Sequence, residues 1–446
     1  MGLILFVLYA CGILMLGKWL EKGKTSECSF YLNNRSSSAA MVAFSIIASC
    51  VGASATIGTI GLAFSAGTPA FWWLGSGAVG LSILAIFLAR KVQNSQAYTL
   101  PEMLENSLGP QVRRLISAII VVAWISILAA QFVAISQIIQ MLTGLTPFVS
   151  LASGALLITV HTLISGQSGI MKLDRIQCFV TIFGLLLLAF WLFQANPAGL
   201  ASVKIQAVNE QFPPSRLFYF LLVLGGSYVV CPTLFGRLLS AKSNKSAQRG
   251  AWGAVIGLCF FSALIVLIGL SARGLIAPNT QPDQVLTSVL ASTLPPWLTH
   301  IVYLTLLSVV ISSADSCLIT ASLVLAGDFL PNKSVKHTRF CIAGIALAGV
   351  ALTAMNKSIL GFLLMANDVY VCGVVAPVFI TIIVGKTKKA QPALMMTALI
   401  LGGTLGTWSS ISGESMFSYI GVSVSALLAA LSFISAKPQV VSAGNS

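Results

Sequence analysis

The stretch Ile311-Ser312-Ser313-Ala314-Asp315-Ser316 decides the fold class of this chain, because it places a carboxylate and three hydroxyls at the centre of an apolar segment. The segment runs from Trp297 to Gly327 and is long enough to cross a membrane as a helix. An acidic side chain at that depth costs roughly 2.5–3.5 kcal/mol on insertion scales. This stretch belongs to a polar stripe that should face a neighbouring helix, a cavity or an ion, either as hydrogen-bonded packing or as an ion or substrate site. At helical spacing the stripe comprises Ser308, Ser312, Asp315, Ser316 and Thr320.

The composition of the whole chain agrees with a membrane protein. Apolar residues make up 57% of the 446 residues, charged residues make up 8%, and the mean hydropathy is +0.94. Soluble domains carry roughly 25% charged residues, so a soluble enzyme is excluded. The sequence contains no phosphate-binding loop, His/Glu metal motif or other catalytic constellation, so we expect no catalytic residues and no enzymatic activity.

Thirteen apolar segments are long enough, or nearly so, to span a bilayer, which predicts an all-α polytopic membrane protein. An odd number of spans places the two termini on opposite sides. The predicted segments are 2–20, 40–66, 70–89, 113–142, 148–165, 174–195, 216–239, 250–275, 297–327, 338–355, 358–384, 393–411 and 415–435.

The basic residues predict the orientation of these spans. With the N-terminus outside, all but four of the 25 lysines and arginines fall in inner loops or at inner helix ends. We therefore expect an outer N-terminus and a cytoplasmic C-terminus in a plasma membrane, the inner membrane of a bacterium. The net charge of +14 is scattered over short loops, so it predicts the lipid bilayer and no nucleic acid as a partner. The four exceptions are Lys204, Arg216, Arg273 and Lys357.

Two of the segments are interrupted near mid-depth by small or helix-breaking residues. Residues 49–59 read SCVGASATIGT, and five segments later residues 224–233 read LGGSYVVCPT. Paired breaks in two halves of a chain indicate a transporter binding site, whereas a glycine-rich packing face plus a proline kink is the alternative explanation. The breaks predict a 5+5 inverted repeat. The repeat consists of a first half at 40–195 and a second half at 216–384, joined by an outer loop at 196–215. An extra span with an inner loop precedes it at 1–39, and two C-terminal helices with a short cytoplasmic tail follow it at 385–446.

Few other polar groups lie within the spans. Asp174 is either a helix N-cap or a coupling carboxylate. Asn367 and Asp368 interrupt a core helix as candidates for the cavity or a gate, and Gln131 lies near the middle of its span. His161 is expected to be a satisfied interface residue and not a proton relay. No lysine or arginine falls in the central part of a span, so an anionic solute would rest on helix N-termini, hydroxyls or a bound cation.

Several stretches match the motifs of one known family in order and spacing. Residues 48–67 resemble its broken first core helix, 98–104 (YTLPEML) resemble its Y-x-L-P-E-F-L loop, and 169–177 (GIMKLDRIQ) resemble the start of its fifth core helix. Residues 235–250 (FGRLLSAKSNKSAQRG) and 312–316 (SSADS) resemble two further motifs. Over residues 30–435 the chain therefore resembles the sodium:solute symporter family, which has a LeuT-like inverted-repeat core.

The resemblance implies symport of a small organic solute with Na⁺ as the coupling ion. The oxygen donors of the family's sodium site, which suit a hard cation, match Ala48, Val51, Val309, Ser312 and Ser313. Some relatives hold a second sodium ion, and Asp315 here replaces a hydroxyl of that site, so a second cation or a proton is expected there. The matching positions are Asp174, Ser312, Asp315 and Ser316.

The resemblance also restricts the solute. The position of Cys50 is Asn or Asp in sugar and proline transporters, and a glutamine of sugar carriers matches Ala55, so we do not expect a sugar. The lack of an intramembrane arginine argues against a sialic-acid-like solute. A proton-coupled symporter and a non-transporting sensor of the same fold remain alternatives, and no obligatory protein partner is evident. We expect an amino acid or a carboxylate, bound by Ser54, Thr56, Gln131, Ser227, Tyr228, Asn367 and Asp368.

Overall fold

The computed structural model describes residues 1–21, 26–197, 203–330, 334–355, 358–385 and 389–434, and these residues form helices joined by loops with no β-strand among them. The all-α prediction is therefore confirmed. Part of the predicted outer loop (198–202), Lys357 and the predicted tail from residue 435 lie outside the described residues.

The main elements are α1 Gly2–Glu21, α2 Glu27–Leu32, α3 Ala39–Cys50, η2 Ser54–Gly58, α4 Thr59–Ala66, η3 Thr68–Phe71, α5 Trp72–Ile83, η4 Leu84–Leu88, α6 Ala89–Gln93, α7 Leu100–Leu108, α8 Pro110–Thr143, α9 Pro147–Ala195, α11 Pro214–Tyr219, η5 Phe220–Gly225, α12 Gly226–Val229, α13 Pro232–Leu239, α14 Asn244–Ser271, η6 Pro282–Gln284, α15 Val285–Thr293, α16 Pro296–Phe329, α17 Val335–Leu352, α18 Ile359–Tyr370, η8 Val371–Val375, α19 Ala376–Val384, α20 Pro392–Ser412 and α21 Ser415–Ile434.

The membrane spans lie where the apolar segments predicted them. The described residues hold 11 helices long and apolar enough to cross a membrane, or 12 when the bent pair formed by α3 and η2–α4 counts as one span. The 49 residues of α9 would measure about 74 Å as one straight helix, over twice the roughly 30 Å of a bilayer core. Instead α9 is interrupted at Gly166, whose φ of 51° suits glycine. Counted as two spans, α9 brings the total to the thirteen expected.

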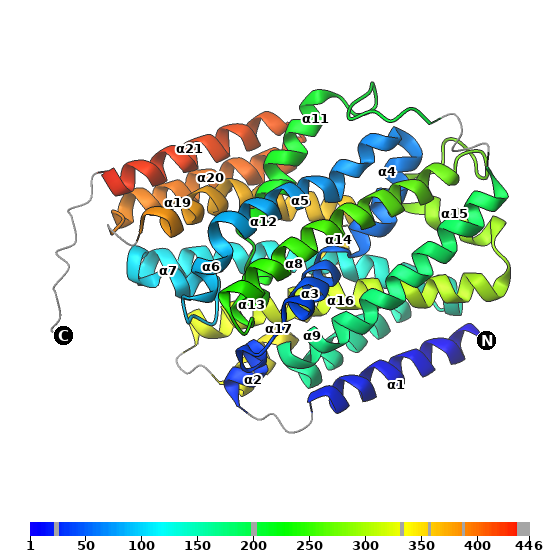
Figure 1. The fold of residues 1–446 in the computed structure, drawn as a ribbon, viewed down its shortest axis with the longest axis horizontal. Helices are drawn as coiled ribbons and strands as arrows, with labels where there is room; N and C mark the ends of the chain where they lie inside the picture. The colour runs from blue at the N-terminus through cyan, green and yellow to red at the C-terminus, as the bar shows by residue number, and fades with distance from the viewer. Residues whose placement is uncertain (22–25, 198–202, 331–333, 356–357, 386–388, 435–446) are drawn as a thin grey trace.

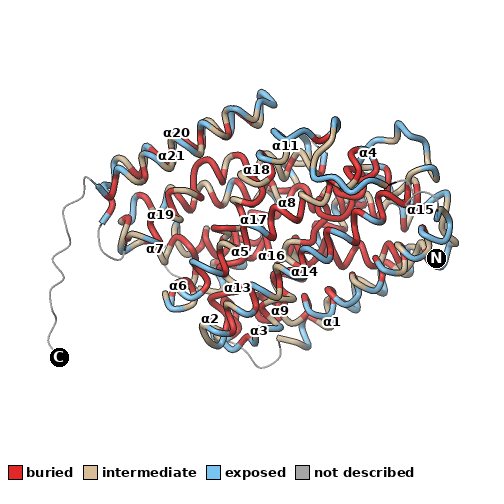
Figure 2. The backbone as a smooth tube through the Cα atoms, turned by 45° about the horizontal axis from the view of Figure 1, so that its top comes forward, coloured by how far each residue is buried: buried red, intermediate tan, exposed pale blue. Residues whose placement is uncertain are grey.

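The helices form a bundle in which α16 is central. The helix α1 and the pair α20–α21 lie on opposite flanks (Figure 1). The apolar window of α16 is 89% buried, whereas that of α1 is 17% buried, and Figure 2 shows the contrast along the chain. The polar stripe on α16 is buried throughout, so it faces protein and not lipid, as predicted. Its residues are Ser308, Ser312, Asp315, Ser316 and Thr320.

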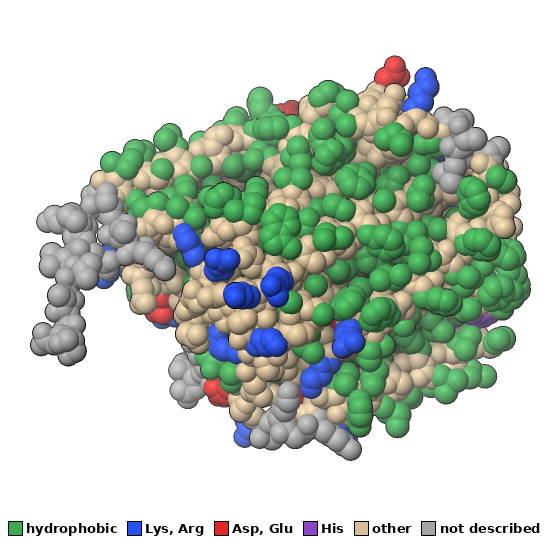
Figure 3. Space-filling model, viewed as in Figure 1, with side chains coloured by type: hydrophobic (Ala, Val, Ile, Leu, Met, Phe, Trp, Pro, Cys, Tyr) green, Lys and Arg blue, Asp and Glu red, His purple; other side chains and the backbone are tan. Residues whose placement is uncertain are grey.

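The ends of the bundle differ in charge. The helix α1 begins at one end and α21 finishes towards the other (Figure 1), as an odd number of spans requires. Lysine and arginine side chains gather over α2, α6 and α13, towards the end where α1 finishes (Figure 3). On the face that Figure 3 shows, the basic side chains therefore lie mainly at one end of the bundle.

Short polar side chains begin several helices. Ser38 starts α3 by accepting a hydrogen bond from the Met41 amide (3.3 Å). Thr99 does the same for Glu102 at the start of α7 (3.3 Å), and the Glu102 carboxylate accepts from the Tyr98 amide in return (3.0 Å). The stretch YTLPEML therefore folds as a helix start with reciprocal hydrogen bonds.

Both predicted breaks are present. The axes of α3 and η2–α4 differ by 67° around Val51, whose φ and ψ are −86° and 74°. In the second half, Val230 is non-helical (φ −129°, ψ 87°) between α12 and α13. Pro232 then starts α13, where its missing amide hydrogen costs nothing.

Candidate ion and solute site

Oxygen atoms of five residues converge where α3 ends against the middle of α16. The Ser312 hydroxyl lies 3.2 Å from the Ala48 carbonyl oxygen and 3.0 Å from that of Val309. The Ser313 hydroxyl lies 3.0 Å from the Ala48 carbonyl and 3.2 Å from that of Ser49. Each hydroxyl has one hydrogen and two carbonyl partners, so the cluster holds an excess of lone pairs suited to a hard cation. Val51, the remaining predicted ligand, follows at the break and is buried.

Gly52 allows α3 to approach α16 this closely. A Cβ at Gly52 would lie 2.7 Å from the Ser313 Oγ and 2.9 Å from its Cβ, closer than ordinary packing permits. The next amide, of Ala53, donates to the Gln131 side-chain oxygen over 3.1 Å. A side chain from α8 thus satisfies a backbone donor that the break frees inside the membrane.

A cavity of about 90 Å³ lies between the two breaks. Its wall carries the rings of Trp73, Trp124 and Tyr228 and the thiols of Cys50, Cys231 and Cys317. No charged side chain of the described residues lines it. Serine, threonine and amide side chains supply the remaining polar groups, so the cavity is neutral and partly aromatic.

Most of the predicted substrate residues reach this cavity, but two do not. Thr56 donates to the Gly52 carbonyl of its own helix (2.9 Å). Asp368 is turned away and accepts from the hydroxyls of Tyr219 and Ser418, at 2.8 Å each. Adjacent residues of a helix point about 100° apart, so Asn367 lines the cavity while Asp368 does not. The predicted residues that line it are Ser54, Gln131, Ser227, Tyr228 and Asn367.

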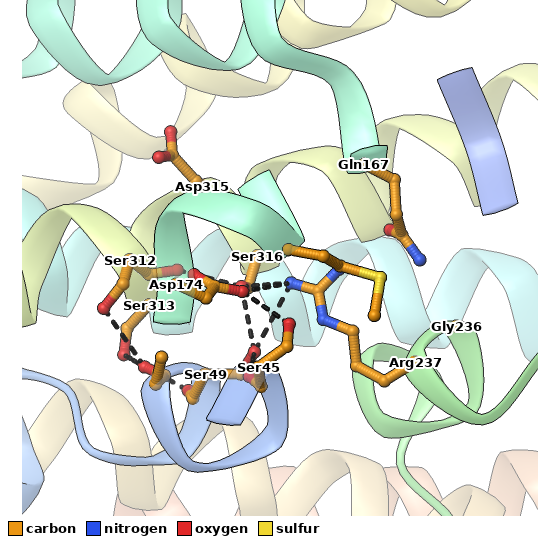
Figure 4. A network of polar contacts seen from close by, with 12 residues as sticks. Ser45, Ser49, Gln167, Asp174, Gly236, Arg237, Ser312, Ser313, Asp315 and Ser316 are labelled. Atoms are coloured by element: carbon orange, nitrogen blue, oxygen red, sulfur yellow. Dashed lines mark hydrogen bonds and ion pairs between the residues drawn. The ribbon is translucent and has the colours of Figure 1, made fainter. Parts of the chain in front are cut away.

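Arg237 corrects the expectation that no arginine lies inside the membrane core. Its side chain is fully buried, and its Nη2 donates to the Ser316 hydroxyl over 2.5 Å and lies 3.6 Å from the Asp174 carboxylate (Figure 4). The Ser45 hydroxyl donates to the same carboxylate oxygen over 2.5 Å. Nε and Nη1 of Arg237 have no hydrogen-bond partner within the described structure. One network therefore joins α3, α9, α13 and α16.

The residues predicted to share a second cation site separate into two groups. Asp174 does not cap a helix, because it lies inside α9 beyond Gly166, and it belongs with Ser316 to the Arg237 network. Asp315 points away from that network (Figure 4). Its carboxylate lies 2.6 Å from His161 Nδ1 and accepts from the Thr162 hydroxyl over 2.6 Å. His161 is a satisfied interface residue, as predicted.

A comparison with protein families identifies the chain. Residues 30–402 match the model described as "Sodium:solute symporter family". The chain belongs to the sodium:solute symporter family. It is therefore a sodium-coupled solute transporter of the membrane and not an enzyme, and the resemblance seen in its motifs is confirmed.

Curated relatives of this symporter carry different solutes. It is 23% identical to the high affinity choline transporter 1 of Homo sapiens, over 94% of this chain and 78% of that protein. It is 23% identical to the sodium/pantothenate symporter of Haemophilus influenzae, over 67% of this chain and 65% of the relative. It is 24% identical to the sodium/glucose cotransporter of Vibrio parahaemolyticus, over 73% of this chain and 68% of the relative.

Solved structures share the symporter's fold. A Na⁺-coupled sialic acid symporter in a substrate-bound outward-open state superposes with a TM-score of 0.83 at 14% identity, covering 99% of each chain. A nucleobase-cation-symport-1 family transporter, in a closed conformation with bromovinylhydantoin bound, superposes with a TM-score of 0.65 at 13% identity. The match covers 90% of this chain and 92% of that transporter. The predicted fold class, an inverted-repeat membrane bundle with two broken helices, is confirmed.

Sequence reasoning missed several residues of the symporter's site. Arg237 stands in a short helix beside the basic loop 242–249, so its charge was attributed to the inner surface. Trp73 and Trp124 lie in predominantly apolar helices, and the sequence around them does not show which rings face a cavity. Cys50 was the one sequence signal for this part of the cavity wall, because some relatives carry an amide or an acid at its position.

Proposed function

We propose that this symporter takes up a small amino acid or carboxylate together with one Na⁺ by alternating access. The observation that carries the proposal is the convergence of the Ser312 and Ser313 hydroxyls on the Ala48 carbonyl at the break of α3. Ser313 also lines the cavity, so an ion bound there would be next to the solute. Each would then raise the affinity for the other by the same factor.

The sodium site in this proposal consists of two hydroxyls and three carbonyls. The end of α3 frees carbonyl oxygens that no intrahelical amide satisfies, and unwound backbone of this kind coordinates coupling ions in transporters. Na⁺ would replace the shared hydroxyl hydrogens as the partner of these oxygens. The five proposed ligands are Ala48, Val51, Val309, Ser312 and Ser313.

A single Na⁺ is proposed because the second predicted site already has its cation. Arg237 brings a permanent positive charge against Asp174 and Ser316. A further cation beside it would be repelled strongly in the low-dielectric core. Asp315 is engaged by His161 and Thr162 on the other side of α16.

The chemistry of the cavity wall supports the solute class. About 90 Å³ is small compared with the roughly 300–1,000 Å³ of pockets for drug-sized ligands. Because no described charged side chain lines the cavity, a carboxylate would be neutralised by the bound Na⁺ and by amide groups at the start of η2.

The aromatic rings of the wall favour a positive group at the other end of the solute. An ammonium group would be attracted to the faces of Trp73, Trp124 and Tyr228, as cations are to aromatic rings. An amino acid satisfies both ends. A choline-like cation is the second candidate, because the same rings would attract it and the human relative is a choline transporter.

The orientation and the moving parts are also part of the proposal. The basic surface over α2, α6 and α13 would face the cytoplasm, with the N-terminus outside, by the positive-inside rule. The membrane would be the plasma membrane, in a bacterium the inner one. Residues 40–195 and 216–384 would form the two repeats, and rocking of one bundle against the other would expose the breaks alternately to each side.

Uptake into proteoliposomes tests the proposal. Pools of radiolabelled amino acids, carboxylates, quaternary amines, nucleobases and sugars are offered under an inward Na⁺ gradient and under a matched K⁺ gradient. We expect Na⁺-dependent uptake from the amino-acid or carboxylate pool. Uptake of quaternary amines alone would favour the second candidate. Na⁺-induced thermal stabilisation without uptake from any pool would favour a sensor, and absence of both effects would refute the sodium site.

A further inference from the structure

Asp368 is a buried carboxylate without a charged partner. It is 3% exposed, within the membrane-spanning α18. The other two buried aspartates of the described spans each contact a basic side chain: Asp174 contacts Arg237 and Asp315 contacts His161. Asp328, which is half-buried near the end of α16, contacts Arg113. The contacts described for the Asp368 carboxylate are to hydroxyl groups only.

The elements packed around Asp368 bring no cation to it. Among the titratable side chains, α11 contributes Arg216 and Tyr219, η8 contributes Cys372 and α21 contributes Tyr419. The contacts described for the Arg216 guanidinium are to the Gln211 carbonyl (3.3 Å) and to the rings of Phe212 and Phe220, not to Asp368. The segments η2, η5 and α20 contain no titratable residue, and the two arginines of α8 lie near its start, where Arg113 contacts Glu105 and Asp328. The Asp283 carboxylate accepts a hydrogen bond from the first amide of α18, that of Ile359, over 3.4 Å. An ionised Asp368 would therefore carry an uncompensated charge in the core, which is strongly unfavourable.

Three hydroxyl contacts connect Asp368 to the turn between α20 and α21. The Ser418 Oγ lies 2.8 Å from Asp368 Oδ1 and 2.8 Å from the Ser409 Oγ. The Ser409 Oγ in turn lies 2.9 Å from the Glu414 carbonyl oxygen. Ser409 and Ser418 are buried, whereas Glu414 is exposed in the turn. The chain of contacts thus runs from the buried acid to the surface.

The number of hydroxyl hydrogens distinguishes two states of this series of contacts. Each serine hydroxyl has one hydrogen. If Asp368 is ionised, Ser418 donates to it and Ser409 donates to Ser418, so the Glu414 carbonyl receives nothing. If Asp368 is protonated, it donates to Ser418, Ser418 donates to Ser409, and Ser409 donates to the Glu414 carbonyl. Only the protonated acid satisfies all three contacts.

We propose that Asp368 is a proton-binding site of this transporter, loaded through Ser418 and Ser409 from the turn between α20 and α21. A hydronium ion at the turn gives a proton to the Ser409 oxygen and remains as water, Ser409 passes its own hydrogen to Ser418, and Ser418 passes its own to Asp368 Oδ1. Each serine gains one proton and loses one, and the carboxylate keeps one. The hydroxyls finish in the arrangement that donates towards Glu414.

The site is placed to act on transport. Asn367, the neighbour of Asp368, lines the solute cavity, so protonation would be sensed by the helix that bounds that cavity. None of the five proposed sodium ligands contacts the Asp368 carboxylate. The inference rests on the proposed transport function only for its uptake measurement, because proton binding can be observed on the purified protein.

Infrared difference spectroscopy during a pH step tests proton binding directly. We expect the wild-type protein to show a protonated carboxyl band that Asp368→Asn lacks. Uptake at a fixed Na⁺ gradient should depend on the pH on the side of the turn in wild type and become flat in Asp368→Asn. Ser423→Ala, which removes an exposed hydroxyl of α21 bonded within its own helix, should retain the wild-type band and profile.

An unchanged carboxyl band in Asp368→Asn, or a pH profile equal to wild type, would overturn the proposal. If that variant does not fold, Ser409→Ala tests the proposal instead, because it interrupts the proton relay two steps from Asp368. If the protonated-carboxyl band appears more slowly in Ser409→Ala than in wild type after the pH step, the relay is supported. If the band appears at the wild-type rate, the relay is refuted. If wild type transports nothing, the band still decides on the proton site, so the failure of the transport proposal is distinguishable.

Discussion

The guanidinium of Arg237 donates to the Ser316 hydroxyl over 2.5 Å and stands 3.6 Å from the Asp174 carboxylate, with all three side chains buried. Arg237 belongs to α13, the part of the second broken helix that follows the break, and Ser316 lies one helical turn from the proposed sodium ligand Ser312. A charged contact therefore joins the second break to the helix that would bind Na⁺.

We expect either Arg237→Gln or Asp174→Asn alone to destabilise the protein by about 3–5 kcal/mol, because each leaves an unpaired buried charge. The double variant should recover much of that loss, because both charges are then absent. Thermal unfolding in detergent measures the effect. Arg90→Gln, which removes an exposed guanidinium bonded to Gln248, is the matched control and should change little. Losses that simply add in the double variant would contradict the pairing.

Replacement of Ser312 and Ser313 by alanine should raise the Na⁺ concentration needed for half-maximal uptake by about tenfold or more, equivalent to about 1.4 kcal/mol or more of lost binding free energy. The thermal stabilisation of wild type by Na⁺ over K⁺ should shrink in parallel, because an ion stabilises only the state that binds it. Ser322→Ala on the same helix, whose hydroxyl bonds to its own backbone, is the control. An unchanged Na⁺ response in the double variant would remove the site assignment.

Gly52→Ala should weaken Na⁺ binding without removing any ligand. The added methyl group would lie under 3 Å from Ser313, so α3 and α16 would have to separate. The apparent Na⁺ affinity from uptake or from thermal shift measures the effect. Gly344→Ala, at a helical position with open space around its Cβ, should retain wild-type affinity. Equal affinities of the two variants would show that the close approach at Gly52 is unnecessary.

Asp315→Asn should leave the apparent Na⁺ affinity within about twofold of wild type and lower the stability by about 1.5–3 kcal/mol, the usual contribution of hydrogen bonds to a charged group. The reason is that its carboxylate bonds to His161 and Thr162 and not to the oxygen cluster. Na⁺ titrations of uptake and thermal unfolding separate the two effects. A loss of Na⁺ affinity as large as that of the Ser312 and Ser313 double variant would place Asp315 in the ion site instead.

Much of the fold could be predicted because the bilayer simplifies the problem. A span needs a long apolar run, so the segments and their number followed from hydropathy. The breaks at Gly52 and Pro232 were visible because these residues are poor helix formers at depths where a helix is otherwise required. The polar stripe of α16 was visible because polar side chains are costly in lipid.

The sequence by itself determined the all-helical membrane fold, the two breaks, and the hydroxyls and carbonyls that meet at the first of them. Only the tertiary structure decided which charges are paired, because the partners come from helices distant in sequence: Arg237 with Asp174, and His161 with Asp315. It likewise turned Asn367 to the cavity and Asp368 away from it. Local pattern sets whether a residue is helical, but the energy of a buried polar group depends on what packs against it.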